Sequence, residues 1–200
     1  MTEPLDLEHE AVARDRALAW ELFEARPEHP EIPRLALGVL ARAPELTGMT
    51  ILLAMHREAC GEIDEARTLL RDLVGRRDRQ YLNALRRLRD LEASDLRYAE
   101  SLRLARLVLR EDPEADWRDR MELATATALA VDPETGWAMM DDAVALSGRT
   151  DPDGYPDALG LRAAWFLTSG APPGRFLVAA QQAIEADPTD ASIATALGFA

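Results

Sequence analysis

The sequence contains no lysine, because all 23 of its basic residues are arginine. Such a bias is typical of a GC-rich genome and suggests a bacterial source. The sequence also contains a single cysteine, Cys60, so that no disulfide can form within one chain. A lone cysteine fits a reducing compartment, where structural disulfides are rare.

Long apolar runs are absent as well. No segment approaches the roughly 18 consecutive apolar residues that a membrane span requires. Residues 1–10 are acidic and have neither the positive start nor the apolar stretch of a secretory signal. A chain of 200 residues with 48% hydrophobic and 30% charged residues has enough apolar side chains for a sizeable core. We therefore predict a cytoplasmic protein without a membrane partner.

The motifs of common catalytic sites are also missing. The three histidines, His9, His29 and His56, form no HExxH pair, and the sequence has neither a GxSxG elbow nor a glycine-rich phosphate loop. His56 and Cys60 are spaced to share one helix face, but two ligands fall short of the four in a structural zinc site. We expect no catalysis, no cofactor and no metal.

The charge of the chain is strongly acidic overall but uneven along its length. A net charge of −13 argues against a nucleic-acid partner, since phosphate binding needs a positive surface. Residues 67–110 nevertheless hold twelve arginines against six acids, whereas the rest of the chain has eleven arginines and thirty acids. This central band has two interpretations, an attractive surface for an acidic partner or solvated arginines on helix exteriors.

Prolines mark a repeated unit in the sequence. Pro44, Pro113, Pro152 and Pro188 are separated by 69, 39 and 36 residues, and the first gap is about twice the length of a helix-turn-helix repeat. Apolar residues between these prolines recur with a helical period. The expected helix pairs are residues 5–23 with 30–43, 47–60 with 64–74, 81–91 with 96–109, 117–129 with 133–146, and 159–167 with 176–187.

Three local features refine this expectation. Asp95 follows Ser94 and is predicted to cap the helix over residues 96–109. Residues 148–156 are the most turn-rich segment, which indicates a bend or an irregular junction. After Pro188 a further helix begins and has no partner before the chain ends, which is consistent with truncation or with packing against another copy.

Residues 60–73, CGEIDEARTLLRDL, resemble the turn and second helix of the tetratricopeptide repeat (TPR) family. Gly61 lies at the turn, Ala66 follows the acidic residue, and Leu70 and Leu73 occupy later packing positions. The corresponding residues before three of the prolines are Ile32, Ala36 and Val39, then Ser101, Ala105 and Val108, then Phe176, Ala180 and Ala183. The resemblance covers about residues 13–200, and the 39-residue spacing of the fourth repeat departs from the family length.

The resemblance implies an all-α, right-handed solenoid of about five helix-turn-helix repeats, in one domain over residues 1–200, plus an unpaired C-terminal helix. It also implies a concave groove lined by the first helix of each repeat. The family's groove positions fall on Arg14, Ala17, Glu21, Ile51, Met55, Glu58, Asn83, Arg86, Arg87, Asp90, Leu161, Arg162 and Trp165. We expect Arg86, Arg87 and Arg162 to bind carboxylates, and Met55 and Trp165 to supply apolar contacts.

Two functional classes follow from this resemblance. The first is a non-catalytic scaffold that binds a peptide or partner protein in the groove, and the arginine positions fit an acidic partner. The alternative is a regulatory or self-associating TPR segment of a longer enzyme, chaperone or transcription regulator. An apolar face at the C-terminus, formed by Ile193, Leu197 and Phe199, suggests a homodimer through the last helix.

Overall fold

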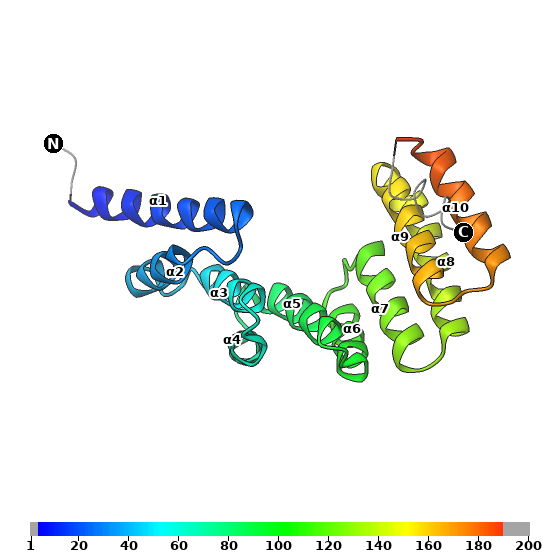
Figure 1. Ribbon diagram of the computed structural model, residues 1–200. Coiled ribbons are helices and arrows are strands. Elements are labelled where there is room, and N and C mark those ends of the chain that lie inside the picture. The colour runs from blue at the N-terminus through cyan, green and yellow to red at the C-terminus, as the bar shows by residue number, and fades with distance from the viewer. Residues whose placement is uncertain (1–3, 190–200) are drawn as a thin grey trace. The chain divides into compact units, whose positions relative to one another are not determined.

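The computed structural model describes residues 4–189, with side chains from His9 onward, and is all-α. This part of the chain contains ten α-helices, one 3₁₀ turn and no strand (Figure 1). None of its helices combines the length and the apolar character needed to cross a membrane. The chain divides into two compact units, residues 1–96 and 97–200, which are described separately below. The single domain expected from the sequence stays a prediction.

The N-terminal unit is a series of helices in which each helix packs on the next. In addition, α1 contacts α3 and α3 contacts α5, so that alternate helices are neighbours as in a solenoid. The core between α1, α2 and α3 is built from aliphatic side chains such as Ile32, Leu35 and Leu52. The helices are α1 (Pro4–Ala25), α2 (Glu31–Arg42), α3 (Gly48–Ala59), α4 (Ile63–Arg76) and α5 (Tyr81–Ser94).

The C-terminal unit continues the same pattern of consecutive packing, and α7 also contacts α9. Its core contains larger side chains, among them Trp117, Trp137 and Phe166, with alanines where helices approach closely. The elements are α6 (Tyr98–Glu111), α7 (Trp117–Ala130), α8 (Pro133–Thr150), the 3₁₀ turn η1 (Pro152–Gly154), α9 (Tyr155–Thr168) and α10 (Pro173–Ala186).

The four prolines end four helices in the same way. In α2, α6, α8 and α10 the last helical residue is followed by one non-helical residue and then by the proline. This residue leaves the helix because the proline ring disfavours the α conformation at the preceding position. In each case its backbone N–H still donates to the carbonyl four residues earlier. The repeat that the proline spacing predicted is therefore present in the structure.

The packing positions inferred from the repeat pattern are buried. The nine residues chosen before Pro44, Pro113 and Pro188 are each no more than 4% exposed, and Ala66, Leu70 and Leu73 of α4 are no more than 2% exposed. Gly61 at the turn has a φ of +79°, which favours glycine. The 39-residue spacing of the fourth repeat, from Pro113 to Pro152, is explained by the length of α8, which has 18 residues where α10 has 14.

Two local predictions are wrong. Asp95 does not cap α6, which begins at Tyr98 after Arg97; Asp95 instead ends α5. Leu96, expected on the apolar face of α6, lies outside the helix with a φ of +58° and is 70% exposed. Leu96 follows the end of α5 in a left-handed conformation that glycine more commonly adopts, and the helical period of apolar residues does not reveal such a position.

The turn-rich segment 148–156 is more helical than expected. The helix α8 runs through Thr150, and the connection to α9 is only Asp151 and the turn η1. Asp151 fixes this junction, because its carboxylate accepts hydrogen bonds from the indole N–H of Trp117 (2.8 Å) and the amide of Gly154 (3.1 Å). These bonds, helped by Arg118, hold the pKa of Asp151 below its ordinary value. The contribution of Asp151 to stability is therefore present near neutral pH and is lost as the pH falls.

Candidate functional site

A hollow of about 610 Å³ opens between the alternate helices of the N-terminal unit. Its lining comes from α1, from the start of α3, and from the start of α5 with the turn before it. These are the first helices of three successive pairs, the elements that the repeat resemblance assigns to a groove. The lining residues are Arg16, Trp20, Leu46, Gly48, Met49, Ile51, Arg79, Gln80, Asn83, Arg86 and Arg87.

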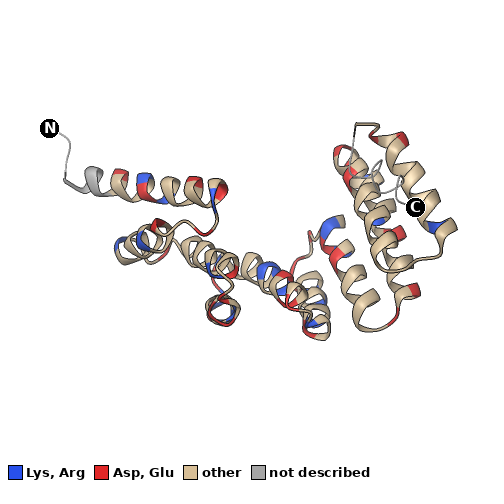
Figure 2. Ribbon diagram, viewed as in Figure 1, with Lys and Arg blue, Asp and Glu red and all other residues tan. Residues whose placement is uncertain are grey.

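The hollow is electropositive. Four of its lining residues are arginines and none is an aspartate or glutamate. Figure 2 shows both basic and acidic residues on α4 and α5. The purely positive charge of the lining is therefore a local feature of the hollow. The half-buried side chains of Leu46 and Trp20 add an apolar surface beside the charges. An arginine cluster next to an aromatic ring suits an anionic segment that also carries apolar side chains.

The four arginines differ in how far they are already neutralised. Arg87 donates to the carboxylate of Glu58 at 3.0 Å, which orients its guanidinium. Arg86 is half-buried and already interacts with another residue of the chain. Arg16 and Arg79 are exposed, and neither forms an ion pair with a carboxylate of the described residues. These last two therefore contribute most of the uncompensated positive charge.

The predicted groove residues of α3 and α5 are partly brought together. Asn83, Arg86 and Arg87 line the hollow as expected. Glu58 supports Arg87 from outside the lining, and Met55 is half-buried against the side chains of Ile51, Leu73 and Ala84. Asp90 lies outside the lining, where its carboxylate accepts a hydrogen bond from Arg89 at 2.8 Å.

Sequence reasoning missed Arg16, Trp20, Arg79 and Gln80. In α1 it selected Arg14, Ala17 and Glu21, but the residues that line the hollow are Arg16 and Trp20, a shift of one position. Arg16 and Trp20 are four residues apart and hence share one helix face, a signal that could have found them. Arg79 and Gln80 come from the turn before α5, which the helix-based groove positions did not include.

In the C-terminal unit, Arg162 is held within the fold. It is 8% exposed, and its guanidinium donates to Asp141 at 3.0 Å and to the side-chain amide oxygen of Gln182. Arg175 binds the second oxygen of Asp141 at 2.6 Å. The predicted neighbour Trp165 is half-buried against the core, and the predicted Leu161 is 45% exposed. Arg162, Trp165 and Leu161 are therefore not included in the candidate site. The predicted dimer residues Ile193, Leu197 and Phe199 lie outside the described residues.

His56 and Cys60 contact each other and the backbone of Pro27. His56 is buried, and its Nδ1 lies 2.7 Å from the carbonyl oxygen of Pro27, which can only accept a hydrogen bond. Nδ1 therefore carries the proton, and Nε2 faces the Cys60 sulfur at 3.6 Å. Within residues 9–189, no three possible metal-binding side chains come together.

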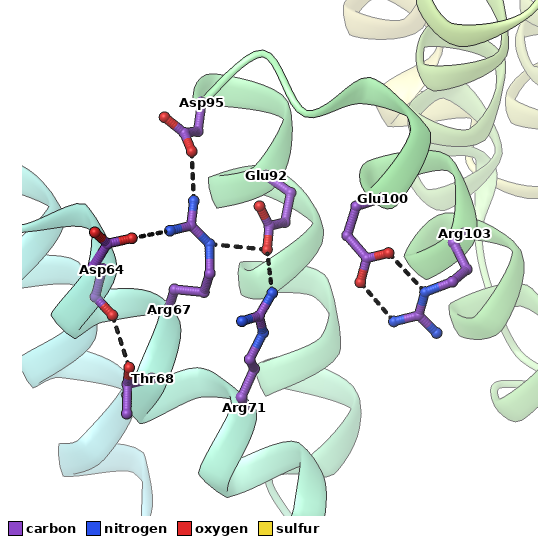
Figure 3. A network of polar contacts seen from close by, with 8 residues as sticks. All are labelled: Asp64, Arg67, Thr68, Arg71, Glu92, Asp95, Glu100 and Arg103. Atoms are coloured by element: carbon purple, nitrogen blue, oxygen red, sulfur yellow. Dashed lines mark hydrogen bonds and ion pairs between the residues drawn. The ribbon is translucent and has the colours of Figure 1, made fainter.

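A buried polar network joins α4 to the C-terminal end of α5, the third helix that lines the hollow (Figure 3). Arg67 of α4 is 5% exposed and donates to Glu92 at 3.0 Å and to Asp95 at 2.5 Å, both at the end of α5. Arg71 also donates to Glu92, at 3.2 Å. Because these bonds span the two helices, the network fixes α5, which carries three of the residues that line the hollow.

Comparisons with known proteins add information on the fold. No protein-family model matches the sequence, and no curated protein matches it. Among solved structures, the chain is similar to the crystal structure of BtubC (BKLC) from P. vanneervenii, with a TM-score of 0.62 and 16% sequence identity. The alignment covers 96% of this chain and 90% of that protein. At this level of identity the likeness shows a shared all-α, solenoid-like fold.

Proposed function

We propose that the chain is a non-catalytic, TPR-like interaction scaffold that binds an extended, acidic segment of a partner protein in the hollow between α1, α3 and α5. The observation that carries this proposal is the lining, in which four arginines and the half-buried Trp20 border one space and none of the lining residues is an aspartate or glutamate. The repeat resemblance and the solenoid-like fold support it.

The physical basis is electrostatic and local. The whole chain has a net charge of −13, which repels an acidic partner at long range, so binding must depend on the arginines that surround the hollow. A guanidinium can hold a carboxylate through two parallel hydrogen bonds, and these bonds are stronger than those between neutral groups. Apolar side chains of the partner then contact Trp20 and Leu46, which gives binding energy that salt does not screen.

Reversal of the two exposed charges tests this proposal. In the double variant Arg16→Glu with Arg79→Glu, we expect affinity for acidic peptides to fall by about 100-fold or more, since two attractive contacts become repulsive. The fold should persist, because exposed charges contribute about 0–1 kcal/mol to stability. The measurement is selection from a displayed random-peptide library with immobilised wild type, followed by titration of the selected peptides.

A matched control keeps the net charge equal. The double variant Arg26→Glu with Arg76→Glu changes two exposed arginines of the same unit that do not line the hollow. It should bind the selected peptides as the wild type does. If both double variants lose the same affinity, the effect comes from total charge, and the hollow is not the binding site.

A further inference from the structure

Two helices begin at the hollow. Gly48 and Met49 from the first turn of α3, and Gln80 and Asn83 from the start of α5, are among its lining residues. At the start of α5 the Asp78 carboxylate accepts a hydrogen bond from the amide of Gln80 at 2.7 Å. The amides of Met49 in α3 and Tyr81 in α5 donate to the carbonyl oxygens of Leu46 and Asp78, so these helix starts offer few free donors. The hydrogen-bond donors of the hollow therefore come mainly from its four guanidinium groups.

The hydrogen-bond donors around the hollow exceed what one carboxylate accepts. Each guanidinium has five N–H donors. Arg87 already donates to Glu58 through its Nη2, and its Nε is buried, so a ligand cannot reach that atom. Arg16 and Arg79 are exposed, and neither forms an ion pair with a carboxylate of the described residues. The site thus offers donors from several directions and a positive charge greater than one.

We infer that the hollow binds a phosphorylated side chain, phosphoserine or phosphothreonine, of the partner segment; this inference rests on the peptide-binding function proposed above. A phosphate monoester carries a charge of about −1.5 to −2 at neutral pH and has three terminal oxygens that accept hydrogen bonds. A carboxylate has two oxygens and a single charge. The phosphate therefore uses more of the guanidinium donors and neutralises more of the positive charge of the hollow.

The apolar part of the lining distinguishes a phosphorylated protein segment from other phosphates. Leu46 and Trp20 border the hollow, are half-buried and can contact the side chains that flank a phosphorylated residue. Inorganic phosphate has nothing to place there. A nucleic acid could stack a base on Trp20, but its extended backbone must pass over the surface of a chain with net charge −13.

The test compares three short peptide libraries that are identical except at a fixed central position, which is phosphoserine, glutamate or serine. Binding of the fluorescein-labelled libraries to the full chain is followed by fluorescence anisotropy. We expect the phosphoserine library to bind at least about tenfold more tightly than the glutamate library, because it makes more charge-assisted hydrogen bonds. This preference should disappear in Arg16→Glu with Arg79→Glu and persist in Arg26→Glu with Arg76→Glu.

Other outcomes separate the two proposals. If the glutamate library binds as tightly as the phosphoserine library and both depend on Arg16 and Arg79, the phosphate inference is wrong and the acidic-peptide function stands. If no library binds, both are wrong. Inorganic phosphate and a labelled single-stranded oligonucleotide serve as further probes, and tighter binding of either one than of the phosphoserine library would overturn the inference.

Discussion

Replacement of Arg67 by methionine is expected to lower the free energy of unfolding by about 3 kcal/mol, because it breaks a buried ion pair from one side. The Glu92 side chain is fully buried, and Arg67 is one of the cations that neutralise it. Methionine fills a similar volume, so most of the loss comes from the charge left in Glu92 and not from a cavity. The measurement is urea denaturation followed by circular dichroism.

Two further variants separate charge from packing. Arg71→Met removes a second cation from Glu92, but the Arg71 side chain is 51% exposed, and we expect a loss of no more than about 1 kcal/mol. The double variant Arg67→Met with Glu92→Met replaces the buried pair by apolar groups and should recover most of the lost stability. A double variant less stable than Arg67→Met alone would contradict this account of the network.

Gly136→Ala is expected to destabilise the C-terminal unit by about 3 kcal/mol through overpacking between α7 and α8. A β-carbon at position 136 would lie 2.4 Å from the Cβ of Ala128 and 2.6 Å from its Cα and backbone nitrogen. Atoms do not approach so closely, so the two helices must move apart around the buried Trp137. Thermal denaturation should show a large decrease in the midpoint.

Gly174→Ala is the matched control for this substitution. Gly174 lies near the start of α10, and a β-carbon there would have no neighbour within 4 Å. We expect an unchanged or slightly higher midpoint, since alanine favours a helix more than glycine does. Adding Ala128→Gly to Gly136→Ala should restore only part of the stability, because two of the close atoms belong to the backbone. Equal midpoints for Gly136→Ala and wild type would show that the helices do not approach as described.

The repeat architecture could be predicted from the sequence because it depends on local rules. A proline excludes the helical conformation from the residue before it, and this rule places the ends of α2, α6, α8 and α10 without any knowledge of tertiary contacts. The helical period of apolar residues likewise identifies the buried faces. The end of α5 could not be predicted in the same way, since Leu96 adopts a left-handed conformation that is uncommon outside glycine and asparagine.

The candidate site could be predicted only in part, because it depends on which residues of three helices face one space. Asn83, Arg86 and Arg87 were found from α5, where a repeat position could be assigned. The register of α1 was one residue off, so Arg16 and Trp20 were missed. Arg162 illustrates the opposite error: its residue type suits a ligand contact, but only tertiary structure reveals that Asp141 and Gln182 already bind it.

The most direct test of the peptide-binding hollow uses three of the four tryptophans as reporters. Trp20 lines the hollow, whereas the indole N–H groups of Trp117 and Trp137 donate to Asp151 and Ser169 inside the C-terminal unit. The measurement is an NMR titration of the indole N–H signals of the full chain with an acidic or phosphorylated peptide selected as above. The account predicts that the Trp20 signal shifts and that the signals of Trp117 and Trp137 stay in place. An unchanged Trp20 signal at saturating peptide would contradict it.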